Sequence, residues 1–210
     1  MKVYQRCSPV SFSTRPLKTE IRDNWRVVLE YENEGSGPYL IDLSHLPKWD
    51  VQGKNLSEIT FQERAIPENP GQSELGDGFL INRMNRTQAS LWHLNGENPE
   101  IPNIPAFTDV TESGVLLALI GREVFSIAEK LTSLDFSDPE KEALFLLQGP
   151  FSHVPCQVVL SDRETPALLW SCSRGYGMDM AESVLAAGEE WGIRPAGENV
   201  FTGWFQKLSD

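Results

Sequence analysis

The segment 39–53 constrains the fold more than any other, because it predicts two strands joined by a tight polar corner. Its first residues, Tyr39–Ile41, are bulky side chains typical of a buried strand. Asp42, Ser44 and His45 then place three hydrogen-bonding side chains in the corner, and Pro47 favours extended geometry just before it. In the second strand, apolar Trp49 and Val51 alternate with polar Lys48, Asp50 and Gln52, the pattern of a half-buried strand.

The length and charge of the chain limit its class. At 210 residues it is expected to form one domain, 1–210, with a core of ordinary size. No apolar run is long enough for a membrane span and the N-terminus lacks the apolar core of a secretion signal, so a cytoplasmic protein is expected. The net charge of −12, with no visible basic cluster, argues against nucleic acid as a partner.

No metal or phosphate site is predicted. Cys7, Cys156 and Cys172 are widely spaced and form no CxxC motif, so they are interpreted as structural or idle thiols rather than as zinc ligands. His93 and His153 are isolated from other ligand-type residues. Neither GxGxxG nor GxxxxGK occurs, which removes the common phosphate-binding loops.

The first half of the chain predicts a short helix and several strands. Trp25–Tyr31 is expected to be a helix capped by Asp23 or Asn24, with a strand as the alternative because Val27 and Val28 are β-branched. A second helix is expected to start within 55–61, and 63–78 reads as a polar loop. Segments 79–83 and 87–94 predict a hairpin, followed by a proline-rich loop over 95–106.

The second half alternates apolar strands with helices. It is expected to begin at Phe107, and the continuous apolar run Val115–Ile120 predicts a strand covered on both faces. A helix over 122–131 follows, then a short apolar stretch at 143–148 and paired strands near 154–160 and 166–172. Helices are predicted at 178–191 and 198–208, the first ending at Gly192. The order predicts an α+β fold of two interlocked ferredoxin-like halves, about 1–106 and 107–210.

Two motifs resemble the aminomethyltransferase family, which includes the glycine cleavage T-protein and the short gamma subunit of heterotetrameric sarcosine oxidase. The first motif is Asp42-Leu43-Ser44-His45-Leu46, followed by Val51-x-Gly53. The second, Val184 to Glu198, is similar to the family's helix-ala-gly-x-x-x-gly-ile-x-pro-x-gly segment. They lie about 140 residues apart in the family's order. The resemblance implies the fold of the aminomethyltransferase folate-binding domain.

The chain departs from the family where catalysis would be expected. The family carries an Asn-Asp pair whose Asp moves protons, and anchoring on Pro70-Gly71-Gln72 places Glu63-Arg64 there. Arginine cannot exchange a proton at neutral pH, and a catalytic base tolerates little displacement. The family's folate-contacting Gly-Glu element aligns near Glu164-Thr165 without its glycine. The chain also stops where the T-protein continues into a further domain.

The candidate site residues are few. Asp42, Ser44 and His45 are expected to hydrogen-bond the corner's own backbone rather than to form a catalytic triad, because neighbours in one turn rarely converge in that geometry. Glu164 and Tyr176 are weak candidates for a folate pocket, with a surface turn and a packed ring as the alternative. No catalytic residue is predicted.

The resemblance therefore implies a non-catalytic assembly or scaffold subunit associated with amine oxidation or one-carbon metabolism. Its partners would be larger oxidase or transferase subunits, with homo-oligomerisation left open and no cofactor expected. The alternative is a tetrahydrofolate-binding protein or a folate-dependent one-carbon transferase, for which tetrahydrofolate would be the cofactor.

Overall fold

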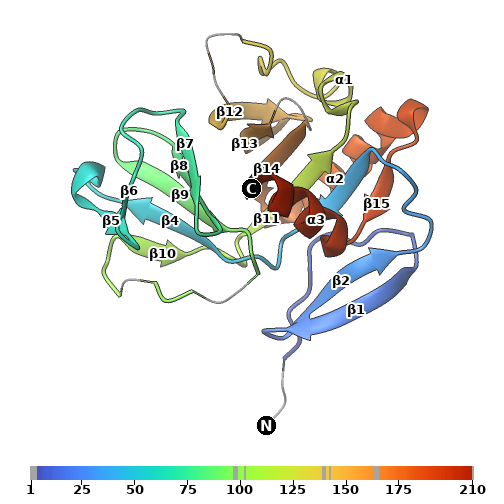
Figure 1. Cartoon of the computed structure of the whole chain (residues 1–210), viewed down its shortest axis with the longest axis horizontal. Helices are drawn as coiled ribbons and strands as arrows, with labels where there is room; N and C mark the ends of the chain where they lie inside the picture. Colours follow the sequence, from blue (N-terminus) through green and yellow to red (C-terminus); the bar gives the residue numbers. More distant parts are fainter. Residues whose placement is uncertain are drawn as a thin grey trace.

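The computed structural model describes residues 4–96, 99–101, 103–138, 141, 143–162 and 166–209. Two sheets and an N-terminal hairpin make up the molecule, with the smaller sheet on the left of Figure 1 and the larger sheet with its helices on the right. It is a sheet-dominated α+β structure, which confirms the predicted class at that level.

The larger sheet has six strands in the order β12-β13-β14-β11-β3-β15. All neighbours are antiparallel except β15 and β3, which run parallel. The strands are β3 (Tyr39–Asp42), β11 (Gly114–Ile120), β12 (Phe145–Phe151), β13 (Val154–Asp162), β14 (Ala167–Ser173) and β15 (Arg194–Ala196).

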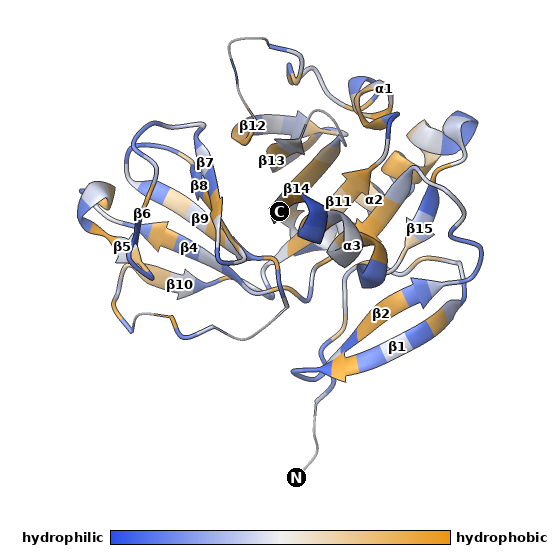
Figure 2. Ribbon diagram, in the orientation of Figure 1, coloured by the Kyte–Doolittle hydropathy of each residue, from blue (hydrophilic) through white to orange (hydrophobic). Residues whose placement is uncertain are grey.

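Helices cover both faces of this sheet, as the apolar run at 115–120 predicts. The helical elements of the second half are α1 (Val124–Glu129), η2 (Arg174–Tyr176), α2 (Gly177–Gly188), η3 (Glu189–Trp191) and α3 (Glu198–Ser209). Leu117 and its alternate neighbours on β11 pack with α1 and α2, whereas Leu116 and its alternate neighbours pack on the side of α3. Figure 2 shows the resulting concentration of apolar residues on β11 and β14.

The smaller sheet has five strands in the order β10-β4-β9-β8-β7, with the ribbon β5-β6 beside it. Its elements are β4 (Lys48–Gln52), η1 (Leu56–Glu58), β5 (Thr60–Phe61), β6 (Arg64–Ala65), β7 (Ser73–Gly76), β8 (Phe79–Arg83), β9 (Gln88–His93) and β10 (Phe107–Asp109). The hairpin β8-β9 confirms the predicted one. A separate apolar core packs between this sheet and the segment that contains η1 and β5, and it is centred on Phe61, Phe79 and Leu91.

The helix expected at Trp25–Tyr31 is wrong, and the strand alternative is confirmed. This segment is β2 (Trp25–Tyr31), paired with β1 (Pro16–Arg22) through a turn in which Asp23 and Asn24 both have positive φ. Side chains along β2 alternate between buried and exposed, so the period of two outweighs the capping signal. The hairpin projects from the body of the molecule, at the bottom of Figure 1.

Three further expectations for the first half are corrected. Segment 55–61 forms only the single 3-10 turn η1 before β5, and the loop expected at 63–78 contains β6 and β7. β10, expected to open the second half, pairs with β4 in the smaller sheet. Within the described part of 1–106 there is no α-helix, and β3 belongs to the larger sheet, so the two ferredoxin-like halves are not confirmed.

Candidate functional site

The polar corner between β3 and β4 is where the chain passes from the larger sheet to the smaller one. Asp42 Oδ1 accepts hydrogen bonds from the Ser44 amide (3.0 Å) and the Ser44 hydroxyl (2.6 Å), and Ser44 Oγ accepts one from the Leu116 amide (3.3 Å). The bond from the Ser44 amide fixes the corner through its own backbone, as the sequence predicts, and the bond from Leu116 also docks the corner on β11.

His45 leaves this local network and does not form a triad. Its Nε2 lies 2.8 Å from Glu198 Oε1, at the first residue of α3, and Arg22 of β1 donates to both oxygens of the same carboxylate (2.8 and 2.9 Å). Burial alone would raise the pKa of Glu198, but the hydrogen bonds and charges of His45 and Arg22 outweigh it and hold that pKa at about 2. The three side chains tie the corner, the hairpin and α3 together.

Lys48 is the second buried charge of the corner. The alternation in 48–52 predicts it on the polar side of the strand, but its side chain is buried and Nζ donates to the carbonyls of Ser44 and Leu46, both at 2.8 Å. Burial lowers the pKa of Lys48 to about 7, against the opposing influence of the carboxylates of Asp42 and Asp109. This amine therefore gives up its proton much more readily than an exposed lysine does.

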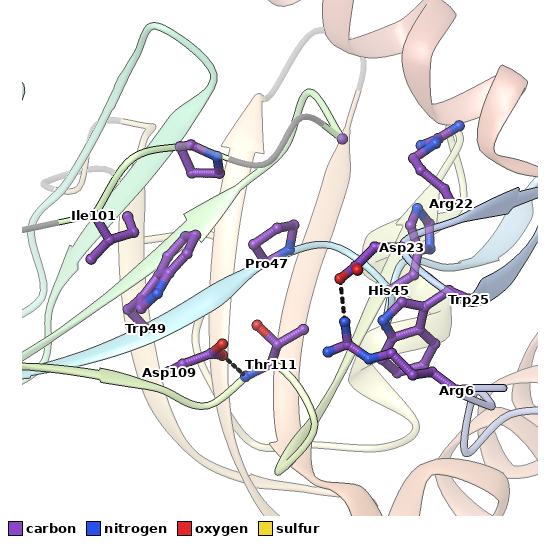
Figure 3. Close-up of a pocket in the computed structure, with 12 residues that line it drawn as sticks. Arg6, Arg22, Asp23, Trp25, His45, Pro47, Trp49, Ile101, Asp109 and Thr111 are labelled. Carbon is purple, nitrogen blue, oxygen red and sulfur yellow. Dashed lines mark hydrogen bonds and ion pairs between the residues drawn. The ribbon is translucent and has the colours of Figure 1, made fainter. Parts of the chain in front are cut away.

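A pocket of about 310 Å³ opens beside the corner (Figure 3). Trp49 and Ile101 line one side of it, and Arg6, Trp25 and His45 line the other. Arg6 pairs with Asp23 and Glu112, and its guanidinium lies over the Trp25 ring, 4.9 Å from the centroid. Because its cations already face carboxylates, the pocket offers few unsatisfied charges to a ligand.

A larger cavity of about 760 Å³ lies between the two sheets. Its lining mixes apolar residues such as Trp92 and Val110 with neutral polar ones, and Cys156 and Cys172 border it. The polar side chains include Gln88 and Ser90 from β9, Gln148 from β12 and Gln157 from β13. Ser90 Oγ donates to Gln157 Oε1 (2.6 Å) and Gln148 Nε2 donates to the Met84 carbonyl (2.6 Å), so hydrogen bonds join the opposite walls. The volume is that of a typical small-molecule site.

The residues aligned with the family's Asn-Asp pair lie away from both cavities. Glu63 has φ 65° and is exposed in the turn between β5 and β6. Arg64 of β6 donates to Asp77 (2.8 and 3.0 Å) and to Glu74 (3.4 Å) on the outer part of the smaller sheet. Neither residue lines the corner pocket or the cavity between the sheets.

Of the two folate-pocket candidates, only Tyr176 lies among the described residues. Glu164 lies outside the described residues. Tyr176 ends η2, is 47% exposed and lines neither of the two cavities described above, so its role in a folate pocket stays a prediction.

Arg22, Lys48 and Glu198 carry the electrostatics of the corner and were missed by sequence reasoning. The contact between His45 and Glu198 spans 153 positions, so no local pattern could indicate it. The one available signal was Glu198 itself, an acidic residue in the first turn of a predicted helix directly after Gly197.

Among the described residues, no three His, Cys, Asp or Glu side chains converge in a way that could hold a metal ion. No helix in the described ranges combines the length and apolar character that crossing a bilayer requires.

Comparison with known proteins places the fold. No family model and no curated protein matches the sequence. A chain of the heterotetrameric sarcosine oxidase from Corynebacterium sp. U-96, solved in complex with pyrrole 2-carboxylate, matches with a TM-score of 0.61 at 11% identity, over 77% of this chain and 90% of that chain. The glycine cleavage system aminomethyltransferase T from Bartonella henselae matches with a TM-score of 0.57 at 16% identity, over 87% of this chain but only 56% of that one. The chain is therefore similar in fold to aminomethyltransferase T and to a chain of heterotetrameric sarcosine oxidase.

Proposed function

We propose that this chain is a non-catalytic subunit that helps assemble a larger amine-oxidising or one-carbon-transferring enzyme. The observation that carries the proposal is the structural match to a chain of heterotetrameric sarcosine oxidase, of which 90% is covered. The finer assignment to the gamma-subunit branch belongs to this proposal. So does the expectation that the partners are larger oxidase or transferase subunits in the cytoplasm.

The chemistry of the site supports a subunit without a reaction of its own. Arg64, which stands where the resemblance requires a proton-transferring carboxylate, is held by Asp77 and Glu74 and cannot act as an acid or base at neutral pH. The carboxylate of Glu198 beside the corner is also occupied, because it pairs with both Arg22 and His45. Its pKa of about 2 leaves it a poor proton acceptor near pH 7.

Co-purification from the native host is the direct test. The tagged chain is recovered by gentle lysis and size exclusion, and its companions are identified by mass spectrometry. The proposal expects a stable complex with a larger subunit of oxidase or transferase type. Recovery of the chain alone, or only as a homo-oligomer, would contradict it.

A pair of surface variants sharpens this test. Leu17 and Ile21 lie on β1 with 57% and 64% of their surface exposed, and β1 pairs only with β2 in the described structure. A strand with a free edge and exposed apolar side chains is a ready contact for another chain. We expect L17D/I21D to weaken recovery of the partner, whereas K18A/E20A on the same strand serves as the matched control.

The second candidate function is binding of tetrahydrofolate, as a ligand or as a one-carbon acceptor. The cavity of about 760 Å³ between the sheets is the observation that favours it, because its size and its amide-lined walls suit a flat polar heterocycle. Calorimetry with tetrahydrofolate at tens of micromolar protein decides between the two. The assembly proposal expects no binding heat, and clear one-to-one binding that the cavity-filling variant S90W abolishes would favour the second candidate.

A further inference from the structure

Two of the three cysteines lie directly opposite each other in the larger sheet. Gln157 of β13 pairs with Ser171 of β14 in an antiparallel ladder, so Cys156 and Cys172 are the next pair in that register. Both are free thiols in the structure, whereas Cys7 is exposed and belongs to the N-terminal segment. The two cysteines form no recognised spacing motif in the sequence, and the pairing of β13 with β14 is what brings them together.

The pair occupies the kind of position in which two strands can be bridged. The amide of Arg174 donates to the carbonyl of Ser113, next to β11. Backbone N–H groups alternate sides along a strand, so the amide of Cys172 also faces β11 and turns away from β13. Cys156 and Cys172 therefore form a non-hydrogen-bonded pair, in which Cβ atoms of opposite residues approach to about 4.5 Å, close to the separation found in disulfides.

The two side chains lie on the face of the larger sheet that packs with α1 and α2, because Gln157 and Ser171, the next pair, point toward the cavity between the sheets. They sit at the edge of that core, with 6% of the surface of Cys156 and 7% of the surface of Cys172 exposed. Their hydrogen bond lowers the pKa of the Cys172 thiol, while the same contact together with burial raises the pKa of Cys156. The contact thus leaves one thiol of the pair easier to deprotonate than an isolated buried thiol, and the thiolate is the reactive form.

We propose that Cys156 and Cys172 form a reversible dithiol–disulfide couple that bridges β13 and β14. With hydrogen peroxide as the oxidant, one of the two sulfurs attacks a peroxide oxygen, the O–O bond breaks, and the leaving hydroxide takes up the thiol proton as water. The second sulfur then attacks the sulfenic sulfur, the S–O bond breaks, and a second water leaves with the proton of the second thiol. Two thiols and one peroxide thus give one disulfide and two waters, and a dithiol reductant reverses the change.

The disulfide would join β13 to β14 at the end of the ladder that faces the smaller sheet. Gln157, which is adjacent to Cys156, accepts the hydrogen bond from Ser90 that links the two walls of the cavity. Oxidation would therefore stiffen the strands that form one wall of the cavity. Disulfide formation does not depend on whether the chain assembles with a partner. Its failure would therefore leave the proposed function untouched, and the reverse also holds.

The test uses the full-length chain with Cys7 replaced by serine, which leaves only this pair. After treatment with a small excess of peroxide and unfolding, we expect the count of free thiols to fall from two to zero. The intact mass should fall by two hydrogens, with no dimer on a non-reducing gel, and dithiothreitol should restore both thiols. Two free thiols after oxidation, or a bridge formed only between molecules, would overturn the proposal.

Single-cysteine variants test the sulfenic step. In C7S/C156S and in C7S/C172S, peroxide followed by dimedone should label the one remaining thiol, because the sulfenic acid has no second thiol to resolve it. Absence of labelling in both variants would overturn the sulfenic intermediate, and circular dichroism checks that both variants fold.

Discussion

Two arginines in this molecule each pair with carboxylates, but the carboxylate bound by Arg22 is buried whereas those bound by Arg64 are exposed. Arg22 binds the buried Glu198 beside His45, where the two sheets, the hairpin and α3 meet. Arg64 binds Asp77 and Glu74 at the outer part of the smaller sheet, where all three side chains contact solvent. The bonds are similar in length, so burial and not contact geometry decides what each arginine contributes to the molecule.

This difference bears on the proposed function. The position that the resemblance assigns to catalysis lies in the exposed cluster around Arg64, whereas the buried cluster around Glu198 is made of structural pairs. A general acid or base works best with a pKa near the working pH, whereas the pKa of Glu198 is lowered to about 2. The substitutions below test how unequal the two clusters are.

The largest effect is expected from Glu198→Ala. Removing this carboxylate leaves Arg22 and His45 without their shared partner at a buried position, and the loss of one member of such a group costs about 3–5 kcal/mol. Urea unfolding at pH 7, followed by tryptophan fluorescence, measures the change in the free energy of unfolding. Glu182→Ala on the exposed side of α2 is the control, and equal midpoints for the two variants would remove the distinction between the clusters.

The second-largest effect is expected from acid, which should reduce the contribution of Glu198 to the free energy of unfolding. Its pKa is about 2 in the folded protein and 4.5 when unperturbed, so below pH 4.5 the unfolded chain takes up a proton that the folded chain does not. The advantage of the wild type over Glu198→Gln should therefore shrink by about 3 kcal/mol as the pH falls from 4.5 to 2. A difference that stays constant across this range would show that the carboxylate is not held ionised.

A smaller change in stability is expected above neutral pH, and it comes from the buried amine of Lys48. Lys48 has a pKa of about 7 in the folded protein and 10.5 when unperturbed, so between these values the unfolded chain holds the extra proton. Stability should rise by about 2 kcal/mol between pH 7 and pH 9. Lys48→Met, which has no titrating group, should lose this rise in a series of unfolding curves, and an unchanged slope would refute the assignment.

The smallest effect is expected from Arg64→Ala. Solvent screens the pairs with Asp77 and Glu74, so the unfolding midpoint should stay within the error of the measurement. The comparison with Arg22→Ala, made under the same conditions, is the informative one. A loss for Arg64→Ala as large as for Arg22→Ala would mean that the outer cluster supports the smaller sheet far more than its exposure suggests.

Local patterns predicted much of the larger sheet. The apolar run at 115–120, the paired strands after it, and the helix α2 with the turn η3 that ends before Gly192, whose φ is 69°, each follow from neighbours in the sequence. Coverage of β11 on both faces also follows, because both sets of alternate side chains are apolar. The local hydrogen bonds between Asp42 and Ser44 were predictable for the same reason.

Contacts between distant segments account for what the sequence did not reveal. The residues of Trp25–Tyr31 suit either a helix or a strand, and pairing with β1 decides in favour of the strand. Lys48 alternates like a surface residue, yet the carbonyls of the corner turn its amine inward. The pairing of Cys156 with Cys172 depends on the register of β13 and β14, which no spacing rule specifies.

The place of β3 in the larger sheet has a consequence for how the chain acquires its structure during synthesis. β3 is made early, yet its two neighbours, β11 and β15, begin at residues 114 and 194. A nascent chain that has emerged only as far as residue 110 therefore carries an apolar strand without either partner, and closing such distant pairings is slow. We expect ribosome-bound fragments of that length to bind chaperones and to resist proteases poorly until the last strand is released.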